Sequence, residues 1–277
     1  MRNLLARVLV FGAALLAPPP AAAQVGDPAI DYRRSYREPV LPEGLQGDGT
    51  GFSFCRLVYR SAWREQGGRG WVTDYPNADR NLMVRTEELT TVEVSKHANG
   101  DFAHSIVTAT HRDLFRCPFL FASDVGTMAL SPEEVSAFRQ YFAKGGFLWV
   151  DDFWGERAWQ QFESEMKRVL PGRSFVELAF DEPMLNALYS IREIPQISNI
   201  GFWRGSGGET RERGAESPTA HIRALYDEAG HLVVMASFDT DLADGWEREA
   251  DDRRFFELFS PEAYAIGTNV LVWIMTH

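Results

Sequence analysis

One segment, residues 131–152, constrains the fold more than any other, because a well-marked helix start and a buried strand lie within it. Ser131-Pro132-Glu133-Glu134 offers an N-cap serine, a proline at the first helical position and two acids in the first turn, and each of these favours a helix start. Gly145-Gly146 then ends the helix, and the apolar run of residues 147–150 is typical of a buried strand. A helix followed at once by a buried strand indicates an α/β sheet.

The rest of the chain repeats this alternation of strand-like and helix-like segments. Strands are predicted at 52–60, 91–96, 118–123 and 175–180, and helices at 79–89, 162–170 and 255–275. Two more strands, 220–227 and 231–238, are joined through Glu228-Ala229-Gly230, which is a hairpin signal. The pattern predicts one α/β domain over residues 52–277, with a mainly parallel sheet, helices on both faces and an antiparallel hairpin at one edge.

The N-terminus has the features of a cleavable secretory signal peptide. Arg2 and Arg7 are positive, an apolar run of about 10 residues follows, and prolines and alanines lead to a predicted cleavage between Ala23 and Gln24. The run is about half as long as a bilayer-spanning helix. We therefore expect export by the Sec pathway to the periplasm or the medium, with no membrane span once residues 1–23 are removed. An uncleaved N-terminal anchor is the alternative.

Charge and composition narrow the possible partners of the mature chain. Residues 24–51 are rich in proline, glycine and charge and show no hydrophobic period, which predicts an extended arm or linker. The formal net charge is −11, and removal of Arg2 and Arg7 with the signal peptide takes it to −13. A surface of this sign repels nucleic acid and anionic membranes. We expect no nucleic-acid partner, and an unidentified ligand or an envelope protein instead.

The chain has two cysteines, Cys55 and Cys117, each near the start of a predicted strand. In an oxidising compartment an isolated pair is a candidate for one disulfide, and two buried thiols are the alternative. Neither cysteine has the spacing of a metal ligand or the setting of a nucleophile on a strand-to-helix turn.

Several motifs together resemble a known family. They are Phe52-x-Phe54-x-Arg56-Leu57-x-Tyr59, Trp71-x-Thr73-Asp74-Tyr75-Pro76-x-Ala78-Asp79-x-Asn81-Leu82, Tyr141-x-x-x-Gly145-Gly146-Phe147-Leu148-x-x-Asp151-Asp152 and Gly267-x-Asn269. On these the chain resembles the bacterial family catalogued as domain of unknown function 4159. The resemblance implies a class I glutamine amidotransferase-like fold, which is a flavodoxin-like, doubly wound sheet. One departure is Asp181-Glu182-Pro183, where we expect the family to have Asp-His-Pro.

Carboxylates and aromatic residues follow the predicted strands, at the edge where open α/β sheets bind ligands. The candidate ligand-binding residues are Trp71, Asp74, Tyr75, Asp124, Asp151 and Asp152. Further acids at this edge are Asp79, Asp181, Glu182, Asp239 and Asp241, with Arg56 or Arg60 as possible counter-charges. A cluster without His or Cys favours a hard cation, so Asp74, Asp124 and Asp151 are the predicted ligands of Ca²⁺ or Mg²⁺.

The same aspartates have a plainer interpretation. Aspartate is common at helix N-caps and in turns, and Asp79 and Asp152 each precede a predicted helix, which predicts that they are caps. The glycine-rich residues 205–208 lie in a polar stretch and predict a mobile surface loop.

No catalytic residue is predicted. Ser123 ends a strand but lacks the Gly-x-Ser-x-Gly setting, and no cysteine nucleophile is placed beside a histidine. The leading hypothesis is therefore non-catalytic binding of a ligand or protein partner at the strand edge, with no cofactor beyond Ca²⁺ or Mg²⁺. The alternatives are a metal-assisted hydrolase that uses the acidic cluster, and a structural or assembly component of the cell envelope.

Overall fold

A seven-stranded sheet has the order β3-β1-β4-β6-β9-β8-β7, and the five strands from β3 to β9 are parallel to one another. The computed structural model describes residues 50–65 and 67–277, so the predicted signal peptide and nearly all of the predicted arm lie outside the described residues. The strands in sheet order are β3 (His104–Thr108), β1 (Phe54–Val58), β4 (Phe119–Ser123), β6 (Phe147–Asp151), β9 (Leu232–Phe238), β8 (His221–Tyr226) and β7 (Val176–Glu177). A separate antiparallel pair joins β2 (Arg60–Ser61) to β5 (Met128–Ala129).

Alternate residues of the central strands point to opposite faces of the sheet and build two cores. In β4, Phe119 and Phe121 enter one core, whereas Leu120 and Ala122 enter the other. This is the period of two expected of a strand that is buried on both sides. The predicted mainly parallel sheet with helices on both faces is thereby confirmed.

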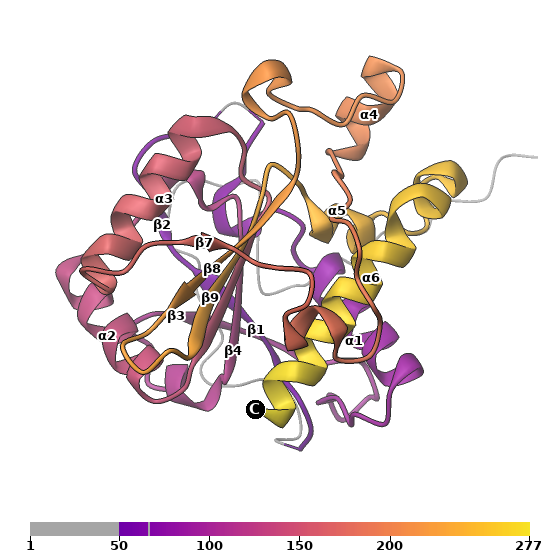
Figure 1. Cartoon of the computed structure of the whole chain (residues 1–277). Coiled ribbons are helices and arrows are strands. Elements are labelled where there is room, and N and C mark those ends of the chain that lie inside the picture. The colour runs from indigo at the N-terminus through magenta and orange to yellow at the C-terminus, as the bar shows by residue number, and fades with distance from the viewer. Residues whose placement is uncertain (1–49, 66) are drawn as a thin grey trace, which may run out of the picture. The chain divides into compact units, whose positions relative to one another are not determined.

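Helices cover each face (Figure 1). The first core packs against α1 (Asn77–Leu89), α5 (Leu242–Glu247) and α6 (Arg253–Thr276), and the second against α2 (Pro132–Ala143) and α3 (Gly155–Val169). The remaining α-helix of the described residues is the short α4 (Ile200–Ser206). None of the described helices combines the length and the apolar character that a membrane span requires.

The helix start predicted at Ser131 and Pro132 is confirmed. Glu134 N donates to Ser131 Oγ at 3.2 Å, and Ser131 N donates to Glu134 Oε2 at 2.7 Å. Pro132 is the first helical residue. This reciprocal capping box satisfies two backbone donors that would otherwise lack partners, so the local sequence alone fixes the start of α2.

The predictions at the two sheet edges were wrong in part. Residues 91–96 form only isolated bridges, one of them between Phe52 and Val94, and the edge strand is β3, which the sequence analysis missed. The predicted strand at 175–180 shrinks to β7. The hairpin of β8 and β9 is confirmed, but β9 pairs parallel with β6, so only β8 and β7 form the antiparallel edge. Pairing partners decide these points, and a local pattern does not contain them.

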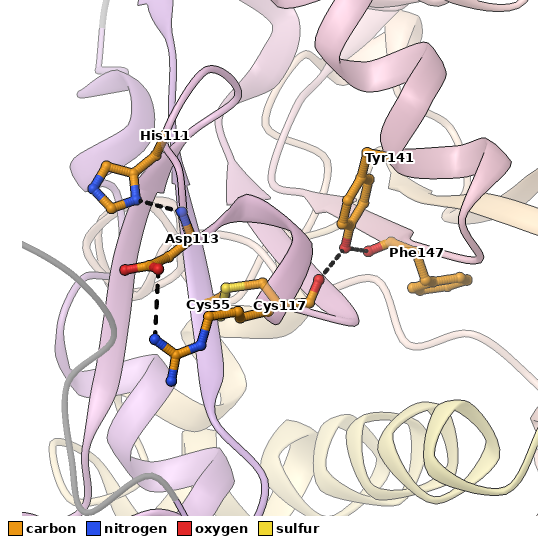
Figure 2. Close-up of a disulfide and its surroundings, with 7 residues drawn as sticks. Cys55, His111, Asp113, Cys117, Tyr141 and Phe147 are labelled. Carbon is orange, nitrogen blue, oxygen red and sulfur yellow. Dashed lines mark hydrogen bonds and ion pairs between the residues drawn. A yellow bond between two sulfur atoms is a disulfide. The ribbon is translucent and has the colours of Figure 1, made fainter.

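The disulfide between Cys55 and Cys117 is present and buried near the amino ends of β1 and β4 (Figure 2). The Tyr141 hydroxyl lies within hydrogen-bond distance of two carbonyl oxygens there, Cys117 O at 2.8 Å and Phe147 O at 3.1 Å. This end of the sheet is therefore covalently joined, and these two carbonyls have a hydrogen-bond partner. A cross-link over 62 residues also restricts the unfolded chain, by about 4 kcal/mol in the loop-entropy account.

Candidate functional site

Loops at the carboxyl edge of the parallel strands contain aspartates in the left-handed conformation. The φ angles are 63° for Asp74, 55° for Asp124, 53° for Asp152 and 57° for Asp239, and no other described residue except glycine has a positive φ. Three of the four directly follow β4, β6 and β9. Aspartate tolerates this conformation because its short polar side chain can bond locally. The chain therefore turns at this edge with residues that also carry charge.

Two of these loops flank the point where the strand order reverses. β1 has β3 on one side and β4 on the other, so the chain winds in both directions from β1. Ligands of open α/β sheets bind at this point, beyond the carboxyl ends of the strands. Asp74 lies in the connection after β1, and Asp124 directly follows β4.

Two groups of three carboxylates lie close enough to hold a metal ion, and Asp74 belongs to both. Ligand oxygens of Asp74, Asp152 and Asp241 lie within 4.8 Å of one another, and the same is true of Asp74, Asp244 and Glu247. The side chain of Asp74 is 5% exposed and that of Asp241 is 1% exposed. A site this enclosed fits an ion better than a large organic molecule.

Asp74 is held by a neighbouring strand end. Ser123 Oγ, buried at the end of β4, donates to Asp74 Oδ2 at 2.6 Å. Asp74 Oδ1 has no such contact among the described residues, so this carboxylate keeps lone pairs for a ligand. Ser123 thus orients a carboxylate, which explains its burial without a nucleophilic role.

Asp124 organises the loop that follows β2. Gly70 N donates to Asp124 Oδ2 at 2.6 Å, and the Tyr59 hydroxyl donates to the Asp124 carbonyl at 2.6 Å. A Cβ atom on Gly68 would lie 2.5 Å from the same Oδ2, so a larger residue at that position would displace the Asp124 carboxylate. Burial raises the pKa of Asp124 to about 6. Asp124 belongs to neither metal-sized group, and its predicted role as a ligand stays a prediction.

Asp151 is fully buried at the end of β6 and is only half satisfied. Ala243 N donates to its Oδ2 at 2.8 Å, whereas its Oδ1 has no hydrogen-bond partner in the described chain. Burial, followed by the nearby charge of Asp74, raises the pKa of Asp151 to about 8. Because Ala243 lies between Asp241 and Asp244 in sequence, the Asp151 carboxyl rests against the turn that carries both acids.

The two predicted helix caps are not caps. The N-cap of α1 is Pro76 and that of α3 is Trp154, so Asp79 and Asp152 serve other purposes. Asp79 forms a fully buried ion pair with Arg56, and Asp152 Oδ1 accepts from Trp154 Nε1 at 2.9 Å. At the amino end of α3, Gly155 N instead donates to Oδ1 of Asp239, the residue after β9, at 2.8 Å. Burial raises the pKa of Asp239 to about 6.

The electrostatics of the first carboxylate group are unfavourable as the site stands. The pKa values of Asp152 and Asp241 are raised well above the ordinary value for aspartate. Burial is the largest cause, and repulsion from neighbouring carboxylates is the next. Burial also raises the pKa of Asp74, against the opposing effects of Ser123 and Arg56. Within the described residues, none of these three side chains takes part in an ion pair. Like charges this close need a proton or a cation among them.

The second group has a partial counter-charge. Arg248 Nη2 lies 2.8 Å from Glu247 Oε2, and Arg248 Nε lies 3.4 Å from Asp244 Oδ1. The counter-charges predicted from sequence have other partners, because Arg56 binds Asp79 and the exposed Arg60 lies 3.8 Å from Glu134. Burial and the charge of Asp74 raise the pKa of Glu247 to about 7. Arg248 therefore offsets only part of the charge here.

The sequence analysis did not name Asp244 and Glu247. They follow Asp241 at intervals of three residues along α5, and Asp241 caps this helix by accepting from Asp244 N at 2.7 Å. Such spacing places acids along one side of a helical turn, which is the signal that could have found them. Asp181 and Glu182 do not join the site, because the chain turns back after Leu178 and Glu182 lies beside Tyr226, at the opposite end of β8.

The predicted aromatic residues line the first loop. Trp71 is half-buried with its ring centroid 5.8 Å from that of the buried Tyr75. The Tyr75 hydroxyl lies 2.6 Å from His104 Nε2, at the start of β3. Trp246 is fully buried in the core. Of these rings, Trp71 is the one with surface left to meet a ligand.

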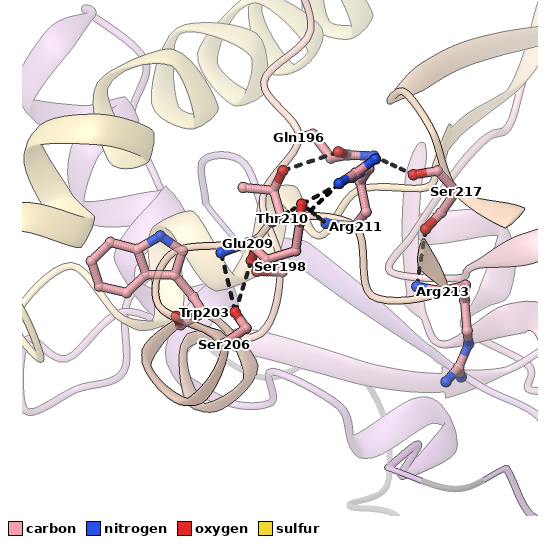
Figure 3. Close-up of polar contacts among 9 residues, drawn as sticks. All are labelled: Gln196, Ser198, Trp203, Ser206, Glu209, Thr210, Arg211, Arg213 and Ser217. Atoms are coloured by element: carbon pink, nitrogen blue, oxygen red, sulfur yellow. Dashed lines mark hydrogen bonds and ion pairs between the residues drawn. The ribbon is translucent and has the colours of Figure 1, made fainter. Parts of the chain in front are cut away.

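Residues 195–217 cross the carboxyl edge between β7 and β8. Ile197 N donates to Thr240 Oγ1 at 3.0 Å, and Ile200 N donates to Asp244 Oδ2 at 2.7 Å. Figure 3 shows how Gln196 ties this segment to itself, through Thr210 and the Ser217 carbonyl. The loop predicted at 205–208 was wrong in part, because residues 200–206 form α4, which ends at Gly207.

The comparisons with known proteins place the chain in a family. The family model described as Domain of unknown function (DUF4159) matches residues 53–275. The chain therefore belongs to this family, which confirms the resemblance seen in its sequence motifs. No curated protein matches the chain.

Proposed function

We propose that this domain binds a divalent cation, Mg²⁺ or Ca²⁺, through Asp74, Asp152 and Asp241, and that it acts in non-catalytic binding of a ligand or protein partner at this edge. The observation that carries the proposal is the convergence of three carboxylates within 4.8 Å without an ion pair among the described residues. The buried, unpartnered Asp151 Oδ1 beside them supports it independently. Of the three ligands predicted from sequence, the proposal retains Asp74. Asp124 and Asp151 do not bind the cation in this proposal, but they hold the surrounding loops in place.

The chemistry of the donors selects the kind of cation. All three are carboxylate oxygens, which hard cations prefer, whereas protein Zn²⁺ sites nearly always include His or Cys. Oxygens bound to one Ca²⁺ lie about 2.3–2.6 Å from it, so two of them on opposite sides are about 5 Å apart. The spacing in the first group fits within that limit. The three side chains of this group, Asp74, Asp152 and Asp241, are all negatively charged when ionised, which favours a cation.

Two broader features belong to the same proposal. We propose that the fold is of the class I glutamine amidotransferase-like type, supported by the strand order around β1 and by the family motifs. We also propose export by the Sec pathway to the periplasm or the medium, supported by the N-terminal sequence and by the Cys55–Cys117 disulfide. In such a compartment millimolar Ca²⁺ or Mg²⁺ suits a carboxylate site of modest affinity.

A metal-assisted hydrolase is the second candidate function. The observation that favours it is the fully buried Asp151, whose Oδ1 has no hydrogen-bond partner among the described residues and is placed to accept a proton from a water at the cluster. A bound cation would supply an activated water in such a reaction. A structural role in the envelope, the third alternative, needs no cation.

Metal binding and melting of the mature chain test the proposal. Protein stripped with a chelator should regain Mg²⁺ or Ca²⁺ by elemental analysis, and its Tm should rise by several degrees at a saturating concentration. Asp241→Asn should abolish the shift, whereas Asp181→Asn, at an exposed acid that lies away from the site, should retain it. Absence of both bound metal and a Tm shift would overturn cation binding. Turnover of ester or phosphoester substrates by the wild type and not by Asp241→Asn would favour the hydrolase.

A further inference from the structure

We propose that Arg56 is a positioning residue of the cation site, which holds the loop of residues 71–79 so that the carboxylate of Asp74 faces the cation. Asp79, the buried partner of Arg56, serves as its fixed counter-charge. The inference rests on the proposed cation site and names what sets the geometry of its central ligand.

The Arg56 guanidinium contacts the chain on both sides of Asp74. Arg56 is the central residue of β1, and its side chain is fully buried. Its Nε donates to Asp79 Oδ2 at 3.2 Å, and its Nη2 donates to Asp79 Oδ1. Its Nη1 donates to the Thr73 carbonyl at 3.1 Å. One planar group therefore fixes the residue before Asp74 and the first turn of α1 at the same time.

Hydrogen bonds carry this constraint to Asp74 itself. Ala78 N donates to the Asp74 carbonyl at 3.0 Å, so the main chain of Asp74 is tied to the start of α1. The φ angle of Asp74 is 63°, a conformation that persists only where the surrounding structure imposes it. Ser123 Oγ donates to one carboxylate oxygen, Oδ2, at 2.6 Å. With Arg56 holding Thr73, the main chain and the side chain of Asp74 are both fixed.

The fully buried pair of Arg56 and Asp79 is a weak source of stability. Removal of two charges from water offsets much of their attraction, and an apolar pair of similar volume often stabilises a fold as well or better. An apolar pair could not donate a hydrogen bond to Thr73 or place a positive charge near Asp74. The Phe121 ring, whose centroid lies 4.8 Å from the guanidinium carbon, holds the plane of the group. The pair therefore supplies an oriented donor, which the site needs and the core does not.

A double-mutant cycle between Arg56 and Asp74 tests the inference, because a residue that acts through Asp74 loses its effect once Asp74 is altered. Arg56→Lys keeps the charge that Asp79 requires, but one ammonium group cannot copy the forked contacts to Asp79 and Thr73. We expect calorimetry to show that this variant binds Ca²⁺ and Mg²⁺ about 10-fold more weakly, as is usual for residues behind a metal ligand. In the Asp74→Asn background the same substitution should change the affinity less than about twofold.

Two controls separate positioning from folding. Arg85→Lys alters a partly exposed arginine of α1 whose partners are Glu88 and Glu249, and it should keep the wild-type affinity. The paired variant Arg56→Met/Asp79→Leu removes both buried charges and leaves neither unpaired. It should fold with a Tm close to that of the wild type, yet lose cation affinity, because the Thr73 carbonyl has lost its donor. Circular dichroism and thermal melting check the fold of every variant.

Each outcome decides the inference. Equal losses in the two backgrounds, or wild-type affinity in Arg56→Lys, would overturn the positioning role and leave the cation site standing. If Arg56→Lys does not fold, the paired variant takes its place in the cycle. Loss of folding in both variants would show that the ion pair is structural and would overturn the positioning role as well. Absence of Ca²⁺ and Mg²⁺ binding by the wild type would overturn this inference together with the proposed function.

Discussion

The two ends of the parallel sheet are built on opposite principles. At the amino end, Cys55 and Cys117 are joined covalently, the Tyr141 hydroxyl contacts two backbone carbonyls, and the nearby charges of Asp113 and Arg116 are paired with each other. At the carboxyl end, buried carboxylates surround Asp74 and two of the nearby oxygens lack hydrogen bonds. The disulfide end stabilises the fold. The buried carboxylates of the other end destabilise the cation-free fold and provide a place where a cation can bind. The following predictions test this division, from the largest expected effect to the smallest.

Removal of the disulfide should affect stability and leave the acidic edge intact. We expect the Cys55→Ala/Cys117→Ala double variant to lose about 4 kcal/mol of unfolding free energy, because its unfolded chain is no longer constrained. Denaturant unfolding measures this loss. Cation affinity, measured under conditions where the variant is folded, should change less than about twofold. A parallel fall in cation affinity would show that the two ends are coupled.

Asp74→Asn should have the reverse effect. Asparagine keeps an oxygen that can accept from Ser123 Oγ, so the local structure is retained while one negative charge is lost. We expect cation affinity to fall by about 100-fold, which corresponds to about 2.7 kcal/mol. The cation-free variant should be at least as stable as the wild type, because repulsion within the cluster is reduced. Calorimetry and urea unfolding in chelator measure the two effects, and a destabilised variant with normal affinity would contradict the comparison.

Stability of the cation-free protein should fall as the pH rises. The pKa is raised to about 8 in Asp151 and to about 6 in Asp239, in both cases mainly by burial. The folded state therefore holds protons that the unfolded chain releases above about pH 4, so the stabilisation is present at low pH and is lost as the pH rises to about 8. We expect a loss of a few kcal/mol between pH 5 and pH 8 in chelator, since Asp151 alone contributes about 1.4 kcal/mol for each pH unit below its folded-state pKa.

Urea unfolding across this pH range, with and without Mg²⁺ or Ca²⁺, checks the prediction. Bound cation should reduce the loss, because it stabilises the ionised carboxylates that the rise in pH creates. A cation-free protein that becomes more stable towards pH 8 would show that these carboxyls are not protonated on folding.

The ion pair between Glu65 and Arg213 should matter least. It joins the loop after β2 to the segment that crosses the carboxyl edge, and its side chains are 20% and 33% exposed. Partly exposed pairs contribute about 0.2–1 kcal/mol. We expect Glu65→Gln to lower the unfolding free energy by about 0.5 kcal/mol and to change cation affinity less than about threefold. A loss above about 2 kcal/mol would assign this pair a structural role like that of the disulfide.

Much of the fold could be predicted because it depends on short-range chemistry. The capping box of Ser131 and Glu134, the glycines after α2 and the apolar run of β6 act within a few residues, and the structure has each of them where the sequence predicted it. The family motifs and the candidate disulfide were also readable, and both are confirmed. The signal peptide rests on residues outside the described chain and stays a prediction.

Tertiary structure decided the composition of the acidic site. The sequence by itself determined that aspartates end the strands, since such turns favour residues that tolerate the left-handed conformation. It did not determine which of them meet. Asp241, Asp244 and Glu247 reach Asp74 only because β9 pairs with β6 inside the sheet, a contact between residues far apart in the chain. Local propensity contains no information about such pairing, so the partners of Asp74 could be identified only in the folded molecule.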